Sequence, residues 1–159
     1  VLAYRVQYDD PYSNAAEWQQ IESYYDPYSG ELQAEVTQFD NGVVGEDVYD
    51  NGSLVTRMLI DNPYYGGGGA FDWTAMTEQY EADQLLFSAT LYDNGDYARS
   101  DFDADGMLAA VWEYDGDGDM DWLGRRSDYD PDGNELAVTL WYEGDPLPSE
   151  LDPYAMAYF

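Results

Sequence analysis

The sequence has 159 residues, of which 34 are acidic and 5 are basic, so its net charge at neutral pH is -29. Such a charge excludes nucleic acid and anionic membranes as partners, because both require positive charge on the protein, and it favours cations. The chain has no cysteine and no histidine, which removes disulfides, thiolate chemistry, the usual zinc site and histidine-based catalysis.

Four stretches of the chain repeat one pattern with a period of about fifty residues. Trp18, Trp73 and Trp122 each begin a segment in which a tyrosine and an acid follow at fixed spacing: "WQQIESYYD", "WTAMTEQYE" and "WLGRRSDYD". In chain order, residues 1–17 are the end of a preceding unit, 18–72 the first unit, 73–121 the second and 122–159 a partial third. We therefore expect one repeat domain over residues 1–159.

Each unit is predicted to contain four strands. Segments such as "ELQAEVTQF" and "LFSATLY" alternate apolar with polar residues, as half-buried strands do. Tight hairpin turns are expected at Asn41-Gly42, Asn51-Gly52, Asn94-Gly95 and Asp105-Gly106, because glycine supplies the positive φ that they need. The apolar content of 45% supports a folded chain. The sequence thus predicts an all-β protein, an antiparallel meander of about eleven strands in an open, curled or solenoid-like sheet.

Three loops contain more aspartates than their turns alone require. They are 101–106, 115–121 and 128–133, and alternate carboxylates on such Gly-containing loops can converge on one hard cation. None is an EF-hand, because the glutamate of that loop is missing. Calcium is therefore the expected cofactor, with the candidate ligands Asp101, Asp103, Asp105, Asp115, Asp117, Asp119, Asp121, Asp128, Asp130 and Asp132. In a meander the first and third loops share one end of the sheet, and the second lies at the other.

The aromatic residues have two interpretations. The repeated tryptophans are expected to be buried anchors that pack each unit on the next. The doublets Tyr24-Tyr25 and Tyr64-Tyr65 leave open a glycan-binding platform, because neighbours on a strand face opposite ways. Arg125 and Arg126 are expected to form local salt bridges.

The Trp–Tyr-Asp spacing, "FDNG", "YDNG" and "LVTRMLID" resemble acidic tandem repeats of large secreted proteins of marine alphaproteobacteria. Those proteins often carry calcium-binding arrays of the RTX kind. A second likeness is to YD-type repeats, whose Tyr-Asp…Gly hairpins curl into shells. The first resemblance implies export from the cell, calcium in the surroundings, and a spacer or adhesive role.

These observations predict a non-enzymatic, secreted, calcium-responsive β-repeat module of a larger surface or exported protein. Its expected partners are divalent cations and, further, glycans or other surface proteins, without nucleic acid and without membrane insertion, since no apolar run is long enough to span a bilayer. One alternative is a carbohydrate-binding module. Another is an acidic structural domain adapted to high salt, with no specific ligand.

Overall fold

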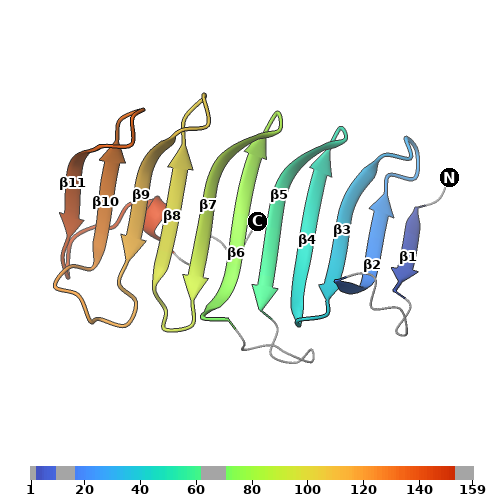
Figure 1. Cartoon of the computed structure of the whole chain (residues 1–159), viewed down its shortest axis with the longest axis horizontal. Helices are drawn as coiled ribbons and strands as arrows, with labels where there is room; N and C mark the ends of the chain where they lie inside the picture. The colour runs from blue at the N-terminus through green and yellow to red at the C-terminus, as the bar shows by residue number, and fades with distance from the viewer. Residues whose placement is uncertain (1–2, 10–16, 62–70, 153–159) are drawn as a thin grey trace.

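The computed structural model describes residues 3–9, 17–61 and 71–152, which form a single antiparallel sheet of 11 strands (Figure 1). Each strand pairs with the strands before and after it in the chain, so the sheet is an open meander. The strands are β1 (Tyr4–Tyr8), β2 (Trp18–Tyr25), β3 (Leu32–Phe39), β4 (Val43–Asp50), β5 (Ser53–Asp61), β6 (Trp73–Glu81), β7 (Gln84–Tyr92), β8 (Tyr97–Phe102), β9 (Leu108–Tyr114), β10 (Gly124–Tyr129) and β11 (Glu135–Trp141). The predicted all-β meander is confirmed.

The strands are connected by turns at the Asn-Gly and Asp-Gly pairs, as predicted. Asn51 and Gly52 join β4 to β5 with φ of 50° and 83°, both in the left-handed region that two-residue hairpins require. Gly42, Gly95 and Gly106 also have positive φ at their turns. Successive turns alternate between the two ends of the sheet, which we call the upper and lower ends as drawn in Figure 1.

The five hairpins of the upper end share one irregularity. In each, the register shifts just before an aromatic residue that is the last or next-to-last residue of the first strand of the hairpin. These aromatic residues are Tyr25, Tyr49, Tyr80, Phe102 and Tyr129. A β-bulge of this kind increases local twist and re-aims side chains. The structure therefore repeats a single bulged hairpin, and each four-strand unit expected from the sequence corresponds to two such hairpins.

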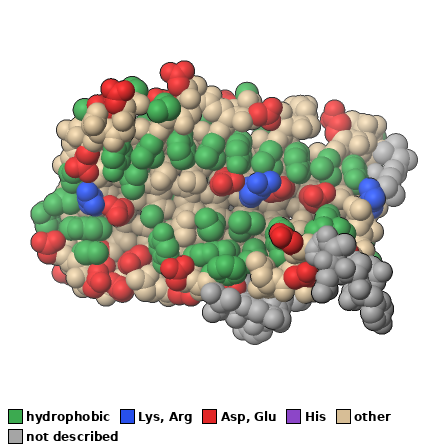
Figure 2. Space-filling model, in the orientation of Figure 1, with side chains coloured by type: hydrophobic (Ala, Val, Ile, Leu, Met, Phe, Trp, Pro, Cys, Tyr) green, Lys and Arg blue, Asp and Glu red, His purple; other side chains and the backbone are tan. Residues whose placement is uncertain are grey.

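The described part of the chain forms one layer over most of its length, and this corrects the prediction for the repeated tryptophans. Trp18, Trp73 and Trp122 were expected to be buried, but each is half-buried, because the described residues form no second layer that encloses them. The buried tryptophan is Trp112, with 6% exposure. On the face turned to the viewer in Figure 2, hydrophobic side chains run in rows across the strands, with charged side chains between them.

A second layer is present over β8 and β9. A short 3-10 turn at Ser149–Leu151 packs on these strands, and the side chain of Leu151 is fully buried. Gly124 makes room for it, since a Cβ there would lie 2.6 Å from a Leu151 methyl carbon. Here the sheet buries Tyr97 and Trp112, whose ring is stacked on Trp141 with 6.2 Å between ring centroids.

Candidate metal centre

The predicted loops lie at the ends that the meander requires, but two candidate ligands are engaged within the strands. Asp101, in β8, accepts hydrogen bonds from Arg99 Nε at 2.6 Å and from Trp112 Nε1 at 2.7 Å. Asp128, in β10, forms a salt bridge with Arg126 at 2.6 Å. Asp101 thus links β8 to β9 through Trp112, whereas Asp128 is neutralised by an arginine of its own strand.

Two further candidates shape the turns of the upper end. One carboxylate oxygen of Asp103 accepts the backbone N–H groups of Asp105 and Met107, both at 2.9 Å. Asp130 does the same for Asp132 and Asn134. This is the local side-chain-to-backbone bonding that favours aspartate in turns. Asp105 and Asp132 themselves are exposed.

At the lower end, two neighbouring connections meet through their glycines. The β7–β8 turn and the β9–β10 connection approach so closely at Gly95 and Gly116 that a Cβ on Gly116 would lie 1.9 Å from the carbonyl oxygen of Gly95. The N–H of Gly116 donates to Asp96 Oδ1 at 2.9 Å. Only glycine permits this contact, and the contact brings acids from both connections together.

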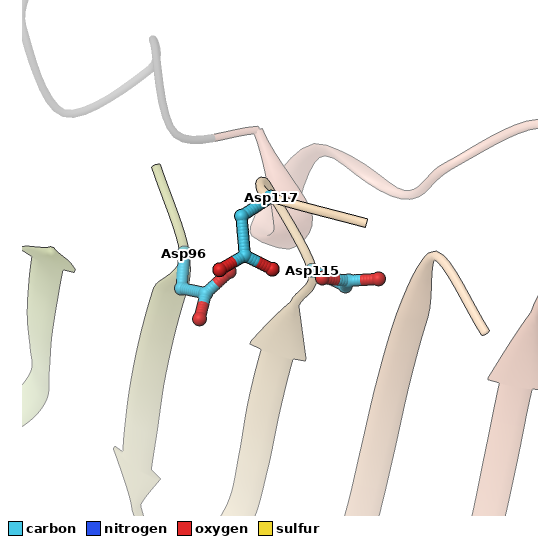
Figure 3. Close-up of side chains that lie close together, drawn as sticks. All are labelled: Asp96, Asp115 and Asp117. Atoms are coloured by element: carbon cyan, nitrogen blue, oxygen red, sulfur yellow. The ribbon is translucent and has the colours of Figure 1, made fainter. Parts of the chain in front are cut away.

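Asp96, Asp115 and Asp117 form the resulting cluster, with one carboxylate oxygen from each within 4.8 Å of the others. In the view of Figure 3, the Asp117 carboxylate lies between those of Asp96 and Asp115. Asn94 donates from its amide nitrogen to Asp96 at 2.7 Å and to Asp117 at 3.0 Å, which bridges the two acids. Asp96 is half-buried, Asp115 is buried and Asp117 is exposed.

The electrostatics of the cluster show unbalanced negative charge. The neighbouring Asp117 carboxylate, followed by partial desolvation and by the charges of Asp115 and Asp96, raises the pKa of Asp119 above its ordinary value. Asp115 is stabilised differently, because it accepts the N–H groups of Gly118, Asp119 and Met120 at 2.9, 3.2 and 3.1 Å. A cation bound here would relieve repulsion that the fold imposes.

The cluster offers carboxylate oxygens as ligands, and the chain has no histidine or cysteine, which suits hard cations and not zinc or copper. Calcium takes six to eight oxygens at about 2.3–2.6 Å, so two oxygens on one ion lie no more than about 5 Å apart. The three carboxylate oxygens, which all lie within 4.8 Å of one another, meet this condition. The described acids supply part of such a shell, and water completes the shell of many calcium sites.

Sequence reasoning identified Asp115 and Asp117 but missed Asp96. Two of its candidates in the same connection, Asp119 and Asp121, are exposed and lie outside the cluster. Among the described residues, the structure places none of the upper-end candidates in a comparable group.

The internal repeat holds a signal for the missed residue. The first unit has Val43 after Asn41-Gly42, whereas the second has Asp96 after Asn94-Gly95. Asp115, by contrast, has the counterpart Asp61, and both are buried. The burial of Asp115 is thus a feature of the repeat, and Asp96 is the departure that completes the cluster in the second unit.

Three further expectations concern the arginine pair, the tyrosine doublets and membrane insertion. Arg125 pairs with Glu113 at 3.0 Å and with Glu135 at 3.3 Å, so that the predicted local salt bridges of the arginine pair are confirmed. Tyr24 is exposed and Tyr25 is half-buried, while Tyr64 and Tyr65 lie outside the described residues. Within the described ranges, no helix has the length and apolar character needed to cross a membrane.

Comparisons with known proteins do not assign the chain to a family. No model of a known family matches the chain, and no curated protein matches it. Among solved structures, it is similar to a mutant of S. aureus TarM in complex with fondaparinux, alpha-GlcNAc-glycerol and UDP, and to a second structure of TarM. Both similarities have 12% identity and a TM-score of 0.41, and they cover 61% and 65% of this chain but 20% of TarM. The chain thus spans about one fifth of TarM, and so low a score carries no argument about function.

Proposed function

We propose that the chain is a non-enzymatic, exported β-repeat module that binds calcium at the lower end of its sheet. Asp96, Asp115 and Asp117 are the protein ligands. The observation that carries the proposal is the meeting of two consecutive hairpin connections at Gly95 and Gly116, which gathers these carboxylates. The proposal places no ion at the upper end, where the described acids form no comparable group of converging carboxylates.

The module would serve as a spacer that stiffens when calcium is present. An ion between the β7–β8 turn and the β9–β10 connection adds a link to the hydrogen bonds by which Gly116 and Asn94 already join the two connections. It also offsets part of the charge of -29, which disfavours the compact state at low ionic strength. A module of this kind is ordered outside the cell, because calcium is abundant there. This agrees with the export that the sequence resemblance implies.

Calcium titration followed by thermal unfolding tests the proposal. A ligand present at 100 times its dissociation constant adds about 2.7 kcal/mol, which for a domain of this size raises the melting temperature by roughly 5–10 °C. The effect should saturate, and magnesium should give less, because it dehydrates reluctantly. Sodium chloride at matched ionic strength should only screen charges, without saturation.

Paired variants locate the ion. The double variant Asp96→Asn/Asp117→Asn should lose the saturable response to calcium. The matched control Asp105→Asn/Asp132→Asn removes the same charge from exposed positions of the upper end and should keep the response. If calcium and sodium stabilise the wild type equally at matched ionic strength, the proposal is wrong and the acidity is a general adaptation to salt.

A further inference from the structure

A hollow of about 320 Å³ lies on one face of the sheet over β3, β4 and β5. Glu35, Asp47 and Arg57 are direct cross-strand partners and form one side of it. Gly45 and Leu59, paired in the next row of the same face, form its floor together with Phe39. The hollow is thus built from three neighbouring strands and lies away from the proposed cation site, which the β7–β8 and β9–β10 connections form.

The floor is apolar because Gly45 has no side chain. Gly45 lies in the middle of β4, and its φ is not in the left-handed region that would by itself require glycine. A Cβ at this position would lie 3.2 Å from the Phe39 ring and 3.2 Å from a Leu59 methyl group. Glycine within a strand often marks a close approach of a ligand or of another group. Here the absence of a side chain at Gly45 lets the Phe39 ring and the Leu59 methyl group lie close to the backbone of β4.

The polar side is held in place and remains reachable. Arg57 donates to both carboxylate oxygens of Asp47, at 2.8 and 2.9 Å, and Glu35 accepts a hydrogen bond from Ser23 at 3.1 Å. The side chains of Arg57 and Asp47 are 42% and 20% exposed. A bidentate pair fixes the orientation of both partners, while the remaining guanidinium N–H groups and carboxylate lone pairs can bond a ligand.

The second unit shows that the fold does not require these groups. The register places Ser88, Ser100 and Val111 where the first unit has Glu35, Asp47 and Arg57. Ala98, paired with Thr90, stands where the first unit has Gly45, paired with Thr37. The same sheet therefore forms without the charged triad and without the glycine. Their presence together around one hollow needs a reason other than strand pairing.

We propose that this hollow binds one unit of a neutral sugar. An anion is disfavoured by Glu35, Asp47 and the net charge of -29, and a metal ion is disfavoured because Arg57 already neutralises Asp47 and the apolar floor supplies no oxygen ligand. Sugar hydroxyls donate to carboxylates and accept from a guanidinium at the same time, and the C–H face of a pyranose fits an apolar aromatic floor. The volume is near the lower limit of ligand pockets, about 300 Å³, which suits a single ring and a dissociation constant on the order of 1 mM.

Amide chemical shifts of the isotope-labelled chain, titrated with methyl glycosides of glucose, galactose, mannose and N-acetylglucosamine, test the proposal. At least one glycoside should cause saturable shifts at Thr37, Gly45 and Leu59. Two kinds of variant carry residues that the second unit already tolerates: the triple variant Glu35→Ser/Asp47→Ser/Arg57→Val, and Gly45→Ala. Each should weaken binding at least tenfold.

Glu46→Ser is the matched control, because it removes a charge from the opposite face of the same strand and should leave binding within twofold. If the triple variant does not fold, Gly45→Ala alone decides the result. The proposal is overturned if no glycoside gives saturable shifts, if the shifts lie elsewhere, or if they persist in the variants. None of these outcomes changes the expected response to calcium, so the two proposals fail separately.

Discussion

At the scale of single residues, the aspartates of this chain perform three different tasks that one sequence pattern does not separate. Asp101 and Asp128 pair with arginines, Asp103 and Asp130 bind turn backbones, and Asp117 belongs to the acidic cluster. The D-x-D-x-D-G pattern predicts turns well, because aspartate bonds its own backbone there. It cannot show which carboxylates remain available, since that depends on residues of the neighbouring strand.

Asp130 provides a test of the turn function through pH. The side chain and the backbone N–H of Asn134 lower the pKa of Asp130 below its ordinary value of 3.8. A lowered folded-state pKa contributes stability that is present above 3.8 and is lost as the pH falls through the folded-state value. Asp130→Asn keeps an acceptor oxygen but no charge. We expect its urea midpoint to lie below that of the wild type at neutral pH, and this gap to close below about pH 4.

The control for this measurement is Asp105→Asn, at the exposed tip of the neighbouring upper-end loop. It removes the same charge without removing a bond to the turn. A gap between wild type and Asp130→Asn that stays constant from neutral pH to about pH 3 would show that the charged form of Asp130 adds nothing to the turn.

Trp112, rather than the three repeated tryptophans, should dominate the stability of the core. Its ring is buried, donates a hydrogen bond to Asp101 and packs under Arg126 at 4.6 Å. Trp112→Ala should cost about 3–5 kcal/mol. Trp73 is half-buried beside Phe71, and Trp73→Ala should cost only about 1–2 kcal/mol. Equilibrium unfolding in urea measures both, and equal losses would contradict this ranking.

At the scale of elements, the hairpins were predictable and the contacts between their ends were not. Asn-Gly pairs and alternating strands are local signals, so the turns, the number of strands and the alternation of ends all follow from them. The approach of Gly95 to Gly116 joins two connections separated by β8 and β9. No local pattern in the sequence predicts this approach. The only sign of it is that Asp96 in the second unit stands where the first unit has Val43.

Gly116→Ala tests the role of this approach. A Cβ would meet the backbone of Gly95 and Asp96 at 1.9 to 2.9 Å, and backbone cannot move aside as a flexible side chain can. We expect a loss of about 1–3 kcal/mol from overpacking, together with loss of the saturable calcium response, because the two connections must separate. Thermal melting with and without calcium measures both effects.

Gly118→Ala, in the same connection, is the control. Gly118 has φ of 77° with open space around its missing Cβ, so alanine should cost only backbone strain of about 1–2 kcal/mol. The calcium response should survive. If both variants respond to calcium as the wild type does, the close approach does not organise the ion site.

At the scale of the whole molecule, the single-layer sheet explains why the burial of side chains was predicted less well than the fold. Strand periodicity shows which residues share a face, but it does not show whether anything covers that face. Most domains bury their sheets against a second layer, and the prediction of buried tryptophans assumed one. In the described part of the chain, Leu151 and the segment around it supply that layer only over β8, β9 and the start of β10.

This architecture should make stability local. Each strand packs chiefly against its two neighbours in the sheet, as in repeat proteins, whose stability is a sum of nearest-neighbour terms. Hydrogen exchange followed by mass spectrometry should therefore show fast exchange in the edge strands β1 and β11. The slowest exchange should occur in β8 and β9, which bury Tyr97 and Trp112 and against which the Ser149–Leu151 turn packs.

Leu151→Ala tests whether the second layer is the cause of this protection. Removing a fully buried leucine should cost about 2–5 kcal/mol, and the loss should be confined to the strands that it covers. Exchange should accelerate in β8 and β9 and stay unchanged in β3 and β4, because a sheet that is stabilised strand by strand does not transmit the loss so far from the turn. Uniform acceleration across all strands would instead show that the eleven strands unfold as one cooperative unit, and that the sheet behaves as an ordinary globular domain.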